Sequence, residues 1–227
     1  MQSCCCAHDR AAGRLFSRLA RLSRRRYRRR GLEPSQRQLM IGLTAAGYRN
    51  ASVLEIGCGV GYLHQTLLQF GAARALGIDL SEKMLSEARQ MAADKGVLDR
   101  TSYRQGDFVE LAKEVEAADI TLLDKVICCY PDAQTLLARS LSRTRKVYAL
   151  TYPRDRFWIK GAVRVENAFL SLIGSDFRNY VYDPHFIQAT IEDAGFGKLH
   201  EATSGPWLSQ VYVAGRAAPK RPLRMRE

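Results

Sequence analysis

Apolar residues recur along this chain in two alternating patterns, short continuous runs and helix-spaced stripes. The short runs are typical of buried strands, and the stripes between them are typical of amphipathic helices. The expected strands are residues 52–56, 74–78, 101–105, 119–123, 146–151, 198–203 and 208–214. Because strand and helix alternate from residue 52 onward, we predict an α/β fold, a doubly wound and mostly parallel seven-stranded sheet. The last two runs predict a hairpin that closes it.

Two helices are expected before the first strand, over residues 9–30 and 34–46. Pro34 can open the second of them, and Gly47 lies beyond its end. The other expected helices are residues 61–70, a helix after the N-cap Ser81, a charged helix before residue 119, residues 132–142 and a helix from Pro184 to Gly195. Aromatic and charged residues concentrate over 153–182, and we expect this insertion and the N-terminal helices to form a substrate pocket.

Length and composition indicate one domain with two appendages. The chain has 227 residues, of which 46% are hydrophobic, enough for a sizeable core. We divide it into a basic arm over residues 1–30, a domain over 31–215 and a basic tail over 216–227. There is no apolar run of 18 residues or more and no secretory signal in the first thirty residues, so we expect no transmembrane span and a cytoplasmic location.

The net charge of +12 is concentrated at the two ends of the chain. Residues 1–30 hold ten arginines against one aspartate, and residues 214–227 hold five cations against one glutamate. The charges of these two ends add up to slightly more than the total charge of the chain, so the body between them is nearly neutral. A solvated arm, a contact with an anionic membrane surface or nucleic acid, and an organellar transit peptide are all open interpretations of the N-terminal arginines.

Three alternating glycines follow the first expected strand. From Glu55 to Gly61 the sequence reads E-I-G-C-G-V-G, and a helix-forming segment follows. Strand, glycine turn and helix let the backbone approach a nucleotide-like ligand. Asp79 ends the second expected strand, where a carboxylate suits the hydroxyls of a ribose. A dinucleotide fingerprint requires glycine at position 62, which is Tyr62, so the motif does not indicate NAD.

The glycine motif and the acidic residues after the second, third and fourth strands resemble class I S-adenosylmethionine (SAM)-dependent methyltransferases over roughly residues 50–214. The resemblance implies SAM as the cofactor. The cofactor-binding residues that it implies are Glu55, Gly57, Cys58, Gly59, Gly61, Asp79, Leu80, Asp107, Phe108 and Asp124. Asp79 matches the ribose-binding residue, while Asp107 and Phe108 match the adenine site. The start of helix 61–70 favours the cofactor's carboxylate.

Methyl transfer from a sulfonium requires alignment and the exclusion of water, and a base only where the acceptor must lose a proton. Candidates for positioning or deprotonation are Asp124, Tyr130, Tyr152 and His64, all expected near the C-terminal ends of strands. For His64 a packing role is the alternative interpretation. No cysteine or histidine spacing indicates a structural metal, so none is expected.

The segment after Asp124 indicates which acceptors to expect. It lacks the Asn/Asp-Pro-Pro-aromatic stretch of amino-methylating DNA enzymes and the paired glutamates of arginine methyltransferases. Its V-I-C-C-Y-P sequence resembles the Ile-His-Tyr-Pro stretch of magnesium-protoporphyrin methyltransferases, with Cys129 where that family has an active-site histidine. We therefore expect a small-molecule acceptor and take Cys129 as a further catalytic candidate.

Three other interpretations stay open at this point. An RNA methyltransferase could use the basic tails, and a regulatory protein could bind SAM without transferring its methyl group. The vicinal pair Cys128 and Cys129, with the N-terminal Cys4 to Cys6, would suit a thiophilic acceptor, because thiolates bind soft ligands.

Overall fold

The structure is a computed structural model that describes residues 5–215, with side chains from residue 10 onward. The predicted basic tail over residues 216–227 lies outside the described residues, as does Cys4. The side chains of Cys5 and Cys6 also lie outside them.

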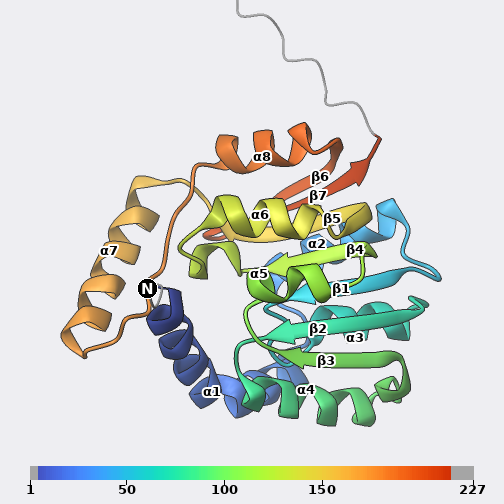
Figure 1. Cartoon of the computed structure of the whole chain (residues 1–227), viewed down its shortest axis with the longest axis horizontal. Coiled ribbons are helices and arrows are strands. Elements are labelled where there is room, and N and C mark those ends of the chain that lie inside the picture. The colour runs from blue at the N-terminus through green and yellow to red at the C-terminus, as the bar shows by residue number, and fades with distance from the viewer. Residues whose placement is uncertain (1–4, 216–227) are drawn as a thin grey trace, which may run out of the picture.

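Seven strands form one sheet in the order β3-β2-β1-β4-β5-β7-β6 (Figure 1). The strands are β1 (Ser52–Ile56), β2 (Arg74–Asp79), β3 (Thr101–Gln105), β4 (Ala118–Asp124), β5 (Thr144–Pro153), β6 (Phe196–Ser204) and β7 (Trp207–Ala214). The first five pair in parallel, while β7 is antiparallel to both β5 and β6. The predicted doubly wound, mostly parallel sheet is confirmed. The strand order reverses between β1 and β4, which opens a crevice at their carboxyl ends.

Helices cover both faces of this sheet. One face carries α2 (Pro34–Ala46), α3 (Tyr62–Gln69) and α4 (Glu82–Asp94), and the other carries α5 (Phe108–Leu111), α6 (Ala133–Leu141) and α8 (Pro184–Asp193). The central strand β1 is buried throughout. Its Val53 packs with the first group of helices, and Leu54 and Ile56 pack with the second. Burial on both faces explains why consecutive residues of this strand, Val53 and Leu54, are apolar.

Capping groups fix the starts of two helices, α4 and α8. The side chain of Ser81 accepts a hydrogen bond from the amide of Met84 at the start of α4, as its position in the sequence predicts. Asp183 caps α8 in the same way, and Pro184 occupies the first turn. Helix bounds differ from the predicted ones by a few residues, which is usual for frayed helix ends.

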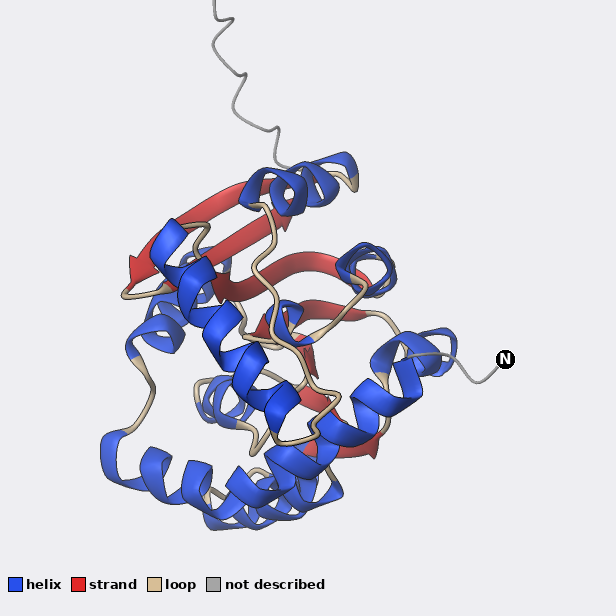
Figure 2. Ribbon diagram, turned by 90° about the vertical axis from the view of Figure 1, so that its left-hand side faces the viewer, coloured by secondary structure: helices blue, strands red, loops and turns tan. Residues whose placement is uncertain are grey.

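Two further helices, α1 (Cys5–Arg30) and α7 (Phe157–Leu172), lie at the carboxyl ends of the parallel strands (Figures 1 and 2). Helix α1 packs on α4 through Ala20, and Arg24 pairs with Glu87 at 2.8 Å. Phe16 and Tyr27 of α1 pack against the domain beside Ala20, whereas Leu22 is 62% exposed. None of the described helices is long and apolar enough to cross a membrane.

Candidate active site

A cavity of about 330 Å³ lies at the carboxyl ends of β1, β2 and β4. On one side it is bounded by the ends of these strands, and on the other by Phe16, Leu19, Ser23 and Arg26 of α1. The predicted site residues that line it are Glu55, Gly57, Cys58, Gly59, Asp79, Leu80, Asp107, Phe108, Asp124, Cys129 and Tyr130. Most of the predicted site residues therefore line this cavity, and the alternation of strand and helix explains why residues far apart in the chain meet here.

The glycine loop owes its shape to left-handed backbone angles. Gly57, Gly59 and Gly61 have φ values of 61°, 53° and 81°, which other residues rarely adopt. A Cβ atom on Gly57 would lie 2.6 Å from Cγ2 of Val126, so the loop also approaches its neighbour closely. A Cβ atom on Gly59 would meet no atom within 4 Å. The loop therefore presents open backbone to the cavity at Gly59, as a cradle for a ligand requires.

The carboxylate of Asp79 holds the glycine loop to the start of α4. Its Oδ2 accepts the amide of Gly59 at 2.8 Å, and its Oδ1 accepts the amide of Ser81 at 2.9 Å. Burial raises the pKa of Asp79, and the two amide donors oppose that effect. Each carboxylate oxygen can accept more than one hydrogen bond, so Asp79 can bind ribose hydroxyls while it orders the loop.

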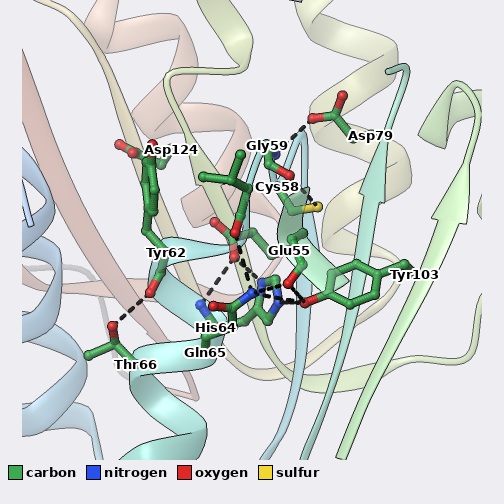
Figure 3. A network of polar contacts seen from close by, with 12 residues as sticks. Glu55, Cys58, Gly59, Tyr62, His64, Gln65, Thr66, Asp79, Tyr103 and Asp124 are labelled. Atoms are coloured by element: carbon green, nitrogen blue, oxygen red, sulfur yellow. Dashed lines mark hydrogen bonds and ion pairs between the residues drawn. The ribbon is translucent and has the colours of Figure 1, made fainter. Parts of the chain in front are cut away.

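Glu55 and His64 form a buried network below the loop (Figure 3). Oε2 of Glu55 accepts a hydrogen bond from the backbone amide of His64 at 3.1 Å. The same oxygen lies 2.5 Å from Nδ1 of the His64 ring. Nε2 of His64 contacts the hydroxyl of Tyr103 at 3.1 Å, and burial raises the pKa of that phenol to about 12. Gln65 also donates to this hydroxyl. Tyr103 and Gln65 have no signal in the sequence that marks them.

This network corrects the candidate role of His64. Its side chain is fully buried, both of its ring nitrogens have partners, and it does not line the cavity. It acts as a packing residue that supports the loop. Because its amide is donated to Glu55, one of the first-turn amides of α3 is also unavailable to the cofactor's carboxylate. Gly61 lies beside His64, where a Cβ atom would be 2.7 Å from Cε1, and likewise does not line the cavity.

Asp107 and Tyr130 are joined across the cavity wall. The hydroxyl of Tyr130 donates to Oδ2 of Asp107 at 2.8 Å, and Oδ1 of Asp107 accepts the amide of Val109 at the start of α5. Phe108 is buried, with part of its surface on the cavity. The predicted acceptor residue Tyr130 therefore also orients the predicted adenine residue Asp107, a coupling that the sequence does not reveal.

Asp124 meets the cavity with one oxygen unpaired. Its Oδ2 accepts a hydrogen bond from Nε2 of Gln36 in α2 at 2.8 Å, while its Oδ1 is buried and accepts none from the described residues. Burial raises the pKa of this carboxyl. The neighbouring Lys125 pairs with Glu33, the N-cap residue of α2. A buried, unpaired carboxylate oxygen indicates a cationic or proton-donating ligand.

Cys128 and Cys129 lie in the short turn Ile127–Cys129 after β4, with their Sγ atoms 3.7 Å apart. Cys128 is buried, and the contact with Cys129 and burial both raise the pKa of its thiol well above the usual value. Cys129 lines the cavity, and its thiol donates to the backbone oxygen of Lys125 at 3.5 Å. A protonated, buried thiol is a poor soft-metal ligand, so the geometry favours packing for Cys128.

Two other sequence predictions are corrected. Tyr152 is 1% exposed and donates to Oε1 of Gln210 in β7, so its hydroxyl faces the core and not the cavity. None of residues 153–182 lines the cavity. Leu170 and Phe177 of this insertion instead pack with Ala11 and Cys129, behind the cavity wall.

These residues fit SAM. The open backbone at Gly59 and the carboxylates of Asp79 and Asp107 suit the sugar and base of a nucleoside, and the unpaired oxygen of Asp124 suits an ammonium group. When bound, SAM supplies an electrophilic methyl group on a sulfonium.

Comparison with known proteins agrees with this fit. Residues 53–146 match a family model described as a methyltransferase domain. A ubiquinone biosynthesis O-methyltransferase from Sinorhizobium medicae is 37% identical over 97 residues, which cover 43% of this chain and 35% of the relative. A probable protein arginine N-methyltransferase 3 from Arabidopsis thaliana is 28% identical over 167 residues, which cover 70% of this chain and 23% of the relative.

The fold is also found among solved structures. The crystal structure of a magnesium protoporphyrin IX methyltransferase from Synechocystis with bound SAH (S-adenosylhomocysteine) superposes with a TM-score of 0.62 and 21% identity. The superposition covers 86% of this chain and 96% of that one. In contrast, the chain spans about a third of the ubiquinone relative and about a quarter of the arginine relative.

Proposed function

We propose that this chain, a class I SAM-dependent methyltransferase that uses SAM as its cofactor, transfers the methyl group to a small-molecule acceptor. The domain match over residues 53–146 and the methyltransferases among the relatives support the predicted family, enzyme class and cofactor. The curated relatives that match include enzymes with different acceptors, so they do not identify the acceptor of this chain.

The observation that carries the proposal is the position of α1. This helix contributes Phe16 and Leu19 to the lining of the cavity that also contains Asp79 and Asp124, so α1 narrows the access to it. At about 330 Å³, it falls at the lower end of the range of small-molecule sites. A folded nucleic acid or protein would require α1 to move away.

The chain's own residues supply alignment, desolvation and a basic oxygen. Asp79 and Asp107 would hold the nucleoside, and Asp124 would hold an ammonium group or accept a proton from the acceptor through its unpaired Oδ1. The apolar side chains of α1 would exclude water from the transfer, which then proceeds by in-line displacement. Tyr130 and Cys129 line the wall beside Asp124 and would contact the acceptor.

The test has two stages. Mass spectrometry should identify small molecules that co-purify with the protein, and a SAH-release assay should then test those molecules as acceptors. We expect turnover with at least one of them, and a Cys128→Ser, Cys129→Ser variant that keeps turnover in proportion to its folded fraction. Abolished turnover in a folded double variant would instead indicate a thiophilic acceptor. SAM binding without turnover in any acceptor screen would favour the regulatory alternative.

One observation favours RNA as a second candidate acceptor. The exposed side chains of Arg10, Arg14 and Arg18 line a shallow hollow with Lys83, next to the start of α4. A polyanion bound there would be released steeply by salt, and truncation of the basic tail over residues 216–227 would reduce the slope. A flat salt dependence of RNA binding would remove this candidate.

The cytoplasmic location of the protein stays a prediction.

A further inference from the structure

Helix α7 turns a large apolar surface away from the protein. The exposed apolar side chains in and just after it are Phe157 (87%), Trp158 (49%), Val165 (71%), Phe169 (61%), Leu172 (85%) and Ile173 (60%). Isolated exposed apolar residues are ordinary, but six of them within one helix and its C-cap form a continuous patch. We call these six residues the α7 face.

The α7 face is one side of a helix with two apolar sides. With successive residues about 100° apart, its members fall within an arc of about 160°. Ile159 and Leu170, on the opposite side, are 4% and 7% exposed and attach the helix to the domain. The exposed side is therefore not the side that folding requires, and α7 lies at the outer edge of the molecule, as Figures 1 and 2 show.

Cations border one edge of this face. On the helix surface, Lys160 and Arg164 lie next to the Phe157 edge of the apolar arc. Arg156 immediately precedes the helix in the sequence. Arg156 and Arg164 are exposed, and neither forms an ion pair with a described residue. Lys160 pairs with Asp155 at 2.7 Å. An apolar arc with aromatic residues and an edge of unpaired arginines is the pattern of a helix that lies in a lipid interface.

We propose that the α7 face docks this protein on a bilayer surface that contains anionic lipids. Phe157, Trp158 and Phe169 would enter the boundary between headgroups and acyl chains, and Arg156 and Arg164 would contact the anionic headgroups. The positive charge at the two ends of the chain attracts the same anionic bilayer at longer range. The proposal does not depend on the identity of the methyl acceptor.

Helix α7 is connected to the cavity wall by hydrogen bonds. Asn167 of α7 donates to the carbonyl of Asn179 at 2.8 Å and accepts the amide of the same residue at 2.8 Å. The next amide, that of Tyr180, donates to the carbonyl of Cys128, and the thiol of Cys129 contacts Oδ1 of Asn179. Docking of α7 would therefore place this wall of the cavity close to the lipid surface.

Co-sedimentation with vesicles tests this proposal with the full-length protein. Vesicles of phosphatidylcholine alone are compared with vesicles that also contain phosphatidylglycerol. The variant Phe169→Ser, Leu172→Ser removes apolar area but no charge, and Phe70→Ser is the matched control, because Phe70 is 58% exposed but lies at the end of α3. Both variants alter exposed side chains, so thermal unfolding should match the wild type.

We expect wild-type protein to bind the anionic vesicles, and the double variant to lose about tenfold or more in partition coefficient. Phe70→Ser should bind like the wild type, and Arg156→Gln with Arg164→Gln should lose severalfold. Wild-type protein that does not bind anionic vesicles would overturn the proposal. So would equal binding by Phe169→Ser, Leu172→Ser, because the basic ends would then account for the interaction. A dimer in light scattering that this variant dissociates, without vesicle binding, would assign the face to a second copy of the chain.

Discussion

Replacement of Asp79 by Ala tests the ribose site and the loop together. The carboxylate accepts the amides of Gly59 and Ser81, and in the substituted protein both donors lose their acceptor. Gly59 lines the cavity, where water can replace the lost contact. Ser81 is 2% exposed, so its amide would stay without a partner at a cost of about 1–3 kcal/mol.

The charge of Asp79 lowers that figure. Burial raises its pKa, which means that the folded protein bears a cost for the ionised form that Ala would remove. We therefore expect the free energy of unfolding to fall by about 1–2 kcal/mol. Loss of the ribose contact should cost a further 1.5–3 kcal/mol of SAM binding, or roughly a 10- to 150-fold rise in Kd.

Urea denaturation measures the first effect, and calorimetric titration with SAM measures the second at a temperature where the variant is folded. Asp99→Ala is the control, because Asp99 is an exposed aspartate outside the cavity lining. It should change neither quantity. A folded Asp79→Ala variant that binds SAM as tightly as the wild type would refute the ribose assignment.

Three further predictions concern carboxylates. Tyr130→Phe removes the donor to Asp107 and should weaken SAM binding about tenfold as well as turnover, which calorimetry and the SAH-release assay measure separately. Asp124→Asn should abolish turnover and raise the free energy of unfolding at pH 7. Burial raises the pKa of Asp124, so ionisation of this carboxyl opposes folding. The stability gained by the Asn variant should vanish as the pH falls below the usual carboxyl range. A variant less stable than the wild type at pH 7 would contradict this reasoning. The backbone donor of Ser52 and the nearby Lys146 lower the pKa of Asp119 to about 2. The stability that Asp119 contributes at neutral pH should therefore be lost as the pH falls from about 4 to 2. In urea titrations, Asp119→Asn should lack that acid-dependent loss.

Sequence patterns predict the parts of this protein that repeat a local rule. The central parallel strands β1 and β4 are rich in apolar residues because both faces of the sheet are covered there, and the carboxyl ends of parallel strands must meet at one edge. For this reason Asp79, Asp107 and Asp124 gather around one cavity although 45 residues separate the first from the last.

Contacts between distant segments were not predictable in this way. Gln36 and Asp124 are 88 positions apart, and nothing in either segment indicates that α2 would reach the end of β4. The position of His64 after the glycine loop suited either a site residue or a packing residue, and only its contacts with Glu55 and Tyr103 decide for packing.

Helix α7 was not predicted either, and the reason lies in its composition. Ile159 and Leu170 point inward while Phe169 and Leu172 point outward, so the segment has no single apolar stripe to recognise. Packing of the domain involves only its inner side, so the core does not account for the apolar residues on its outer side.

Calorimetric titration of the wild-type protein with SAM, SAH and NAD tests the central claim most directly. The cavity at the ends of β1, β2 and β4 predicts one binding site per chain for SAM and SAH, and no comparable heat with NAD. A folded protein that binds neither SAM nor SAH, or that binds NAD as tightly, would contradict the assignment of this cavity as a methyltransferase site.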